Sequence, residues 1–168
     1  MKYHISLLFL FCAFLMQAQQ ESLTKTRFVT GLSVPELIHL GANVDVGKRS
    51  QIGASTGFLV FYGYHPTLSV EHRLYFSKLN DFTNRRNWFF RQSGTYLPSI
   101  GDEIGSDYQT ALSLSIGLDF RSKSRKSGWT LDLGAFIAFP HEDSTGSNSD
   151  TVIGPMLRIQ YYSYFKKK

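Results

Sequence analysis

Apolar and polar residues alternate along most of this chain with the period of a β-strand. The clearest case is residues 109–121, in which every second residue from Leu112 to Phe120 is apolar and serine, glycine or aspartate stands between them. Residues 129–139 and 151–165 repeat the pattern. Because successive side chains of a strand point to opposite faces, such segments predict strands with one apolar and one polar face.

Eight segments of this kind can be distinguished, and no helical periodicity is sustained beyond the first residues. They are residues 27–34, 40–46, 51–62, 67–77, 87–97, 109–121, 129–139 and 151–165. Their lengths lie near the ~9–11 residues of a tilted membrane strand. Pro35, Pro66 and Pro98 fall in the expected connections, and Pro155 lies inside the last strand. An even number of strands can close with both termini at one end, so the sequence predicts an all-β, up-and-down antiparallel transmembrane β-barrel of eight strands.

The polar face is made mainly of small residues rather than the Lys, Glu and Gln that a water-facing surface would carry. This favours a narrow packed lumen inside and lipid outside. A soluble lipocalin-like binder of apolar ligands, with the two faces reversed, stays open as an alternative. The inward set also holds charges of both signs, which we expect to form a network across the lumen, with Arg158 reaching Asp132 and Glu71 meeting Arg91. The set consists of Asp45, Glu71, Arg73, Arg91, Asp119, Asp132 and Arg158.

Aromatic residues recur at the same ends of the strands if the chain runs up and down, which predicts an interfacial girdle. Its members are Phe28, Phe76, Trp88, Phe120, Trp129 and Phe165. Tyr62, Tyr96, Tyr108 and Phe139 lie toward the opposite end.

Charge is sorted by side as well. The connections on the side of both termini are basic, and Asp81 is their only acid: Lys48, Arg49, Lys78, Arg85, Arg86, Arg121, Lys123, Arg125, Lys126 and 166–168. Those on the other side are acidic: Glu36, Asp102, Glu103, Asp107, Glu142, Asp143 and Asp150. In a barrel of this kind the basic side is expected to face the periplasm.

The first residues have the features of a secretory signal peptide. Lys2 precedes the apolar stretch 5–16, and Ala18 offers a small residue for cleavage. The single cysteine, Cys12, lies inside this stretch, so lipidation is not expected and the mature chain would contain no cysteine. We therefore expect a signal peptide over residues 1–18 and one barrel domain over residues 19–168.

These patterns together resemble the small OmpX/OmpA-like outer-membrane β-barrels of Gram-negative bacteria. The last strand ends in the aromatic residues Tyr161, Tyr162, Tyr164 and Phe165, although lysines 166–168 follow them. The resemblance implies an outer-membrane location, with outer-membrane lipids and the barrel-assembly machinery as partners. It names no extracellular ligand.

No pattern in the chain predicts catalysis, a cofactor or a metal site. The histidines are not spaced as a metal cluster, and the basic residues form no aromatic-laced patch for nucleic acid. His72 lies on the apolar face, where a lipid A deacylase type of enzyme would need a serine and an acid beside it. The chain has no His-x-Ser there, and Glu71 points inward. We therefore expect a structural or surface-interaction role without enzymatic activity, with a narrow solute or ion channel as the alternative.

Overall fold

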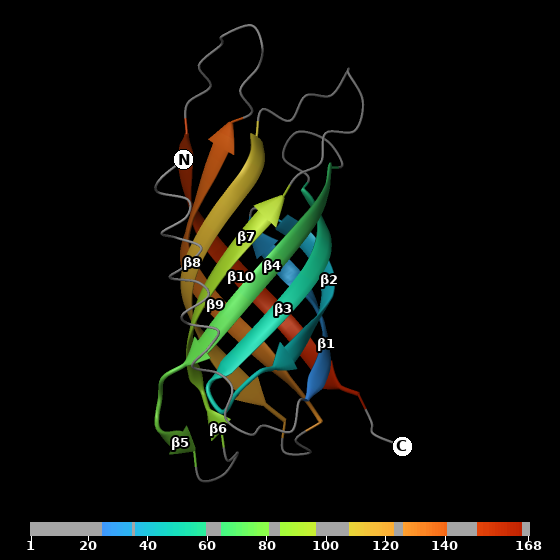
Figure 1. Ribbon diagram of the computed structural model, residues 1–168, viewed down its shortest axis with the longest axis vertical. Helices are drawn as coiled ribbons and strands as arrows, with labels where there is room; N and C mark the ends of the chain where they lie inside the picture. Colours follow the sequence, from blue (N-terminus) through green and yellow to red (C-terminus); the bar gives the residue numbers. More distant parts are fainter. Residues whose placement is uncertain are drawn as a thin grey trace, which may run out of the picture.

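The computed structural model describes residues 25–34, 36–59, 65–80, 85–96, 108–122, 126–140 and 151–165. Eight of its strands form one closed antiparallel barrel, in the order β1-β10-β9-β8-β7-β4-β3-β2 (Figure 1). The barrel strands are β1 (Thr26–Val34), β2 (Glu36–Asp45), β3 (Ser50–Leu59), β4 (His65–Tyr75), β7 (Trp88–Tyr96), β8 (Tyr108–Arg121), β9 (Ser127–Pro140) and β10 (Val152–Tyr164). The predicted all-β, up-and-down, eight-stranded architecture is confirmed. No helix in the described part of the chain is long and apolar enough to span a membrane.

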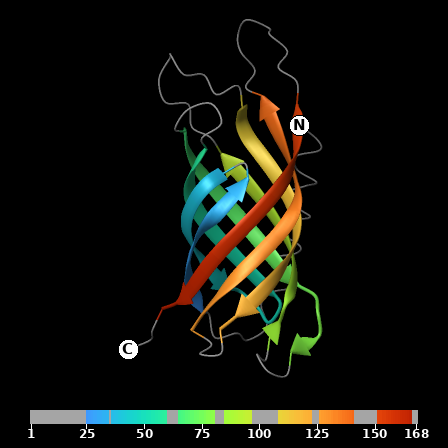
Figure 2. The same ribbon diagram turned by 180° about the vertical axis from the view of Figure 1, so that it is seen from behind.

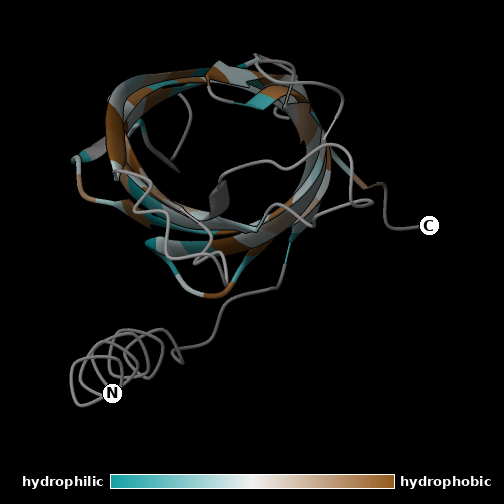
Figure 3. Cartoon of the chain, turned by 90° about the horizontal axis from the view of Figure 1, so that it is seen from above, coloured by the Kyte–Doolittle hydropathy of each residue, from teal (hydrophilic) through white to brown (hydrophobic). Residues whose placement is uncertain are grey.

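The barrel closes where its first and last strands meet. β1 pairs with β10 in a register that runs from Arg27 opposite Tyr164 to Val34 opposite Leu157. Figure 2 shows β10 crossing this side of the molecule, and Figure 3 shows the strands as a ring when seen from above. Closure leaves no unpaired sheet edge, which is the condition that lipid imposes on a spanning β-structure.

Several strand limits differ from those that the sequence predicts. β2 begins at Glu36 rather than at residue 40. The sequence pattern missed these first residues because an irregularity between Glu36 and Ile38 exposes both Leu37 and Ile38 and interrupts the alternation. Pro66 was expected in a connection but lies in β4, next to the first residue of the strand. Pro155 does lie within β10. A small hairpin of β5 (Leu79–Asn80) and β6 (Arg85–Arg86), which the sequence did not suggest, extends from the barrel between β4 and β7.

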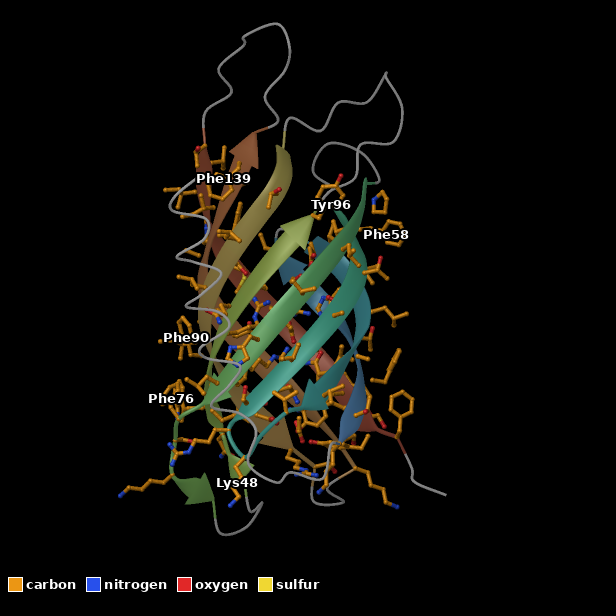
Figure 4. All side chains as sticks on the ribbon, in the orientation of Figure 1. Lys48, Phe58, Phe76, Phe90, Tyr96 and Phe139 are labelled. Carbon is orange, nitrogen blue, oxygen red and sulfur yellow. The ribbon has the colours of Figure 1, made fainter. Side chains whose placement is uncertain are left out.

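The two faces of the wall differ sharply in chemistry. Outward residues are apolar and accessible: Leu68 and Val70 are each 57% exposed and Leu133 is 61% exposed. Inward residues are enclosed and mainly polar, and Arg27, His39 and Thr130 have no exposed surface at all. The chain therefore folds around a polar interior, and its apolar side chains project outward over the wall (Figure 4).

Glycines let bulky inward side chains cross the narrow lumen. A Cβ atom on Gly53 would lie 2.1 Å from Oδ1 of Asn43 and 3.0 Å from Cγ of Glu71. At Gly117 a Cβ would lie 2.4 Å from the ring of Phe89 and 2.6 Å from Cβ of Asp132. Both positions need a residue without a side chain because side chains from neighbouring strands already fill the space.

Gly53→Val should therefore destabilise the barrel, while Ala54→Val, one residue further along β3 on the exposed outer face, should not. Overpacking at Gly53 is expected to cost about 1–3 kcal/mol of unfolding free energy. Urea unfolding of both variants in detergent micelles measures the difference. Equal unfolding midpoints would show that the lumen beside Gly53 has room to spare.

Candidate functional site

The centre of the lumen holds one carboxylate surrounded by cations. Glu71 of β4 lies 2.8 Å from Nη2 of Arg73, 2.9 Å from Nη1 of Arg158 and 3.5 Å from Nη1 of Arg91. Asn43 of β2 donates a fourth contact to the same carboxylate through Nδ2, at 2.8 Å. Glu71 is 5% exposed, so these groups replace the water that a carboxylate would otherwise bind.

Arg91 connects this centre with a second carboxylate on the far wall. Its Nε donates to Oδ2 of Asp132 at 2.7 Å, and Ser115 of β8 donates to the same oxygen at 3.0 Å. Arg158 extends the network in another direction, since its Nε donates to Nε2 of His39 on β2 at 3.1 Å. Strands from all sides of the barrel are thus joined through its interior.

A second cluster, joined to the centre by the hydrogen bonds of Gln51 with Asn43 and Asp45, occupies the end of the lumen where β1 begins and β10 ends. Tyr162 donates to Oδ1 of Asp119 at 2.5 Å, and Tyr75 donates to Oδ2 at 3.1 Å. Arg27 lies 3.5 Å from Asp119 and 3.6 Å from Asp45, and its guanidinium lies over the ring of Tyr162, 4.6 Å from the centroid. Two tyrosine rings and the two ion pairs of Arg27 therefore close this end.

The opposite end of the lumen holds Glu36, whose partners are hydroxyl groups. Ser69 donates a hydrogen bond to Oε1 of Glu36, as do Thr67 at 3.2 Å and Thr95 at 3.5 Å. A small cavity lies between Glu36 and the central network, and both Arg91 and Arg158 line it. Glu36 is 6% exposed, so its expected place in an acidic outer connection is wrong: the start of β2 carries it into the lumen.

The structure places all seven predicted lumen charges in the interior, with Asp45 nearest the solvent at 13% side-chain exposure. Glu71 and Arg91 meet as the sequence suggested. Arg158 does not pair with Asp132 in the way the sequence suggested, although the two residues are opposite each other in the register. The long arginine side chain reaches across the lumen to Glu71 instead, and Asp132 is bound by Arg91.

Sequence reasoning missed several members of the network. Arg27 could have been found, because it precedes the outward Phe28 in a predicted strand and must therefore point inward. His39 accepts a hydrogen bond from Arg158 and Asn43 donates one to Glu71, but their polar side chains were not recognised as part of the charge network. Among the described residues no group of three His, Cys, Asp or Glu side chains could hold a metal ion.

The six residues of the expected girdle all lie on the outer surface near one end of the barrel. Their exposures range from 38% for Phe28 to 62% for Phe165. At the opposite end Tyr96 and Phe139 are also exposed, together with Phe58, and Figure 4 shows these three well separated from Phe76. Tyr62 lies outside the described residues, and nothing is described of the Tyr108 side chain.

No protein-family model matches the sequence, and no curated protein matches it. The structure is similar to the crystal structure of the N-terminal β-barrel domain of OprF from Pseudomonas aeruginosa, with a TM-score of 0.52. The match covers 84% of this chain and 96% of that one. The chain has the fold of an outer-membrane β-barrel. At 9% sequence identity the likeness extends to the fold alone, and the residues of the lumen must be interpreted from this structure.

Removing the charge of Glu71 should be more damaging than removing that of Asp45. Glu71→Gln leaves three buried guanidinium groups without their shared carboxylate, an effect expected to cost about 3–5 kcal/mol. Asp45→Asn, the matched change at the mouth of the lumen, should cost less because water reaches that side chain. Urea unfolding in detergent micelles compares the two.

Adding Arg158→Gln to Glu71→Gln should recover part of the lost stability, since it removes one of the stranded cations. A double variant no more stable than Glu71→Gln would contradict the proposed coupling between the two side chains.

Proposed function

We propose that the protein is an integral outer-membrane β-barrel of a Gram-negative bacterium with a structural or surface-interaction role. The observation that carries this proposal is the arrangement of the two faces of the wall. Most of the large side chains exposed on the wall are apolar, whereas most charged side chains of the barrel strands are buried. This is the reverse of a water-soluble barrel, and it is the order that a lipid environment stabilises.

The extent of the exposed apolar surface supports a membrane location. Exposed apolar residues come from every strand of the barrel wall, and several are more than half exposed, including Leu32 at 57% and Ile153 at 70%. Soluble monomers rarely expose a contiguous apolar patch larger than a few hundred Å². A lipocalin-like binder would instead hold its apolar residues around an internal ligand cavity, where this barrel holds Glu71, Arg73, Arg91 and Arg158.

The contents of the lumen argue against a wide channel. Eight strands enclose a space that side chains can fill, and here ion pairs cross it at the centre while Arg27, Asp119 and Tyr162 close one end. A narrow ion path is the second candidate, favoured by the cavity beside Glu36. That path would need the contacts of Arg91 and Arg158 with Glu71 to open.

The orientation follows from the charges of the connections. One end of the barrel holds the start of β1, the end of β10 and the basic residues Lys48, Arg49, Lys78 and Lys126. We assign this end to the periplasm. The acidic connections would then face the outside, where a ligand of unassigned chemistry would bind. Lipids of the outer membrane and the barrel-assembly machinery are the partners that this placement requires.

The chain without residues 1–18 should need detergent or lipid to remain in solution. Folded barrel should also migrate faster on a denaturing gel before boiling than after it, because the closed ladder resists unfolding by detergent. Centrifugation with and without detergent, followed by the paired gel lanes, tests both expectations. A monomer that stays soluble in buffer alone would overturn the membrane assignment.

The barrel should show no sustained conductance in planar lipid bilayers, because paired charges block its centre. Arg158→Ala removes a side chain that crosses the lumen and should produce measurable current events, whereas Lys48→Ala on the exposed turn should not. Steady current through the unaltered protein would favour the narrow ion path.

A further inference from the structure

A polar trio interrupts the apolar outer face near the basic end of the barrel. Ser50 opens β3, His72 lies on β4, and Gln92 lies on β7, the next strand around the wall. The residues beside them in sequence point into the lumen, as Gln51, Glu71 and Arg91 do, so the trio must face outward. Leu68 and Val70, on the same face of β4, confirm that this side of the wall is the exposed apolar one.

The three side chains bind one another in a row. Oγ of Ser50 lies 2.7 Å from Nε2 of His72, and the amide nitrogen of Gln92 lies 3.1 Å from Nδ1 of the same ring. A serine on one ring nitrogen and an orienting group on the other is the geometry by which a histidine activates a nucleophile. As placed, the amide nitrogen of Gln92 can only donate to Nδ1, which puts the ring proton on Nε2. The proposed chemistry uses the other amide placement: a half-turn exchanges the amide oxygen and nitrogen, sets the oxygen against Nδ1–H and leaves Nε2 free to accept the proton of Ser50.

Mutual hydrogen bonding explains how the trio is tolerated beside lipid, but it does not explain why polar residues stand there. Three apolar residues would satisfy this face at lower cost, and an ionisable side chain in a membrane wall generally marks a functional site. His72 is enclosed at 6% exposure, while Ser50 is half-buried. The serine is therefore the member of the trio through which a substrate would be met.

The surroundings indicate which substrate could reach this serine. Ser50 follows the exposed Lys48 and Arg49 of the β2–β3 turn, and the exposed Phe76 and Trp88 flank the ends of β4 and β7. Figure 4 shows Lys48 below the end of the barrel near which Phe76 lies. Aromatic side chains of this kind mark the level where hydrocarbon meets headgroups, and cations there attract lipid phosphate. The ester carbonyls of glycerophospholipids lie at the same level.

We propose that Ser50, His72 and Gln92 form a catalytic site that hydrolyses an acyl ester of an anionic glycerophospholipid in the adjacent leaflet. Ser50 Oγ bonds to the ester carbonyl carbon while its proton passes to Nε2 of His72. The ester C–O bond then breaks, and His72 returns the proton to the departing glycerol oxygen, which releases a lysophospholipid. Water attacks the acyl-serine by the same proton route, releasing the fatty acid and restoring Ser50. Gln92 is a positioning residue that holds the ring.

This proposal goes beyond the structural role above and departs from the absence of catalysis expected from the sequence. The chain spacing could not reveal the site, because its three members stand on three strands and meet only through the barrel register. Ser50 and His72 are diagonal neighbours, since Ile52 is opposite His72, and Gln92 is directly opposite His72.

The test uses the full mature barrel in vesicles of phosphatidylglycerol and phosphatidylethanolamine that carry a labelled acyl chain. The unaltered protein should release labelled fatty acid and lysophospholipid. Ser50→Ala and His72→Asn should each lower the rate by about 100-fold or more. Thr56→Ala is the matched control: Thr56 is an outward hydroxyl on the same strand, but it donates to the carbonyl oxygen of Thr67 at 2.9 Å. This control should keep the full rate.

The role of Gln92 has its own readout. Gln92→Leu should lower kcat with little change in KM, and Gln92→Glu should restore it, because a carboxylate can also accept from Nδ1–H. A purely structural role would leave kcat unchanged in every variant that folds, as judged by the gel shift between unboiled and boiled samples.

A second measurement is independent of whether the variants fold. A fluorophosphonate probe on the unaltered protein should modify Ser50, as located by peptide mass. The proposal is overturned if the unaltered protein releases no fatty acid above protein-free vesicles, if Ser50→Ala keeps the rate, or if the probe leaves Ser50 unmodified. None of these results would alter the assignment of the barrel to the membrane.

Discussion

The carboxylate of Glu71 is the point on which the interior of this barrel depends. Three guanidinium groups and one amide converge on it from β4, β7, β10 and β2. Each of these arginines would be costly to bury alone, and Glu71 makes their burial tolerable by supplying the shared negative charge. Arg158 is 87 residues from Glu71 in sequence, so the contact also ties the last strand of the barrel to the middle of the chain.

The same interaction separates the two surfaces of the wall. Because the buried charges are paired inside, the outer surface is free to be apolar, and the strands can alternate around an interior that is mainly polar. A soluble protein gains stability by burying its apolar side chains, whereas here lipid would provide that environment and the interior provides specificity through polar contacts. The polar contents of the lumen are consequently a structural element of the fold. Its Arg27–Asp119 end is likewise closed by buried charges that pair with each other.

The outer surface also carries a connected polar group, the trio of Ser50, His72 and Gln92. In the membrane placement that we propose, its position just inside the basic end would bring these polar side chains to the level of lipid headgroups, acyl esters and water. Strand alternation decides that these residues face outward, and strand register decides that they touch. A barrel of this size can therefore hold a closed interior and a polar cluster on its wall at once, because the two faces use alternate residues of the same strands.

The sequence by itself determined the class of the fold and the direction of most side chains in the regular strands. Alternation is a local property, so the faces of residues 109–121, the inward place of Glu71 and the outward place of Trp129 could all be predicted from their neighbours. Prediction from alternation failed where the backbone is irregular. The bulge after Glu36 breaks the period of two, and for this reason the Glu36 carboxylate was assigned to an outer connection. Only the tertiary structure decided which residues meet. Register places Arg158 opposite Asp132, yet the arginine crosses to Glu71, and three strands had to align before Ser50 and Gln92 could flank His72. The physical reason is that facing depends on the period of a single strand, whereas contact across a lumen or along a wall depends on stagger, side-chain length and competition among all the charges that the closed barrel brings together.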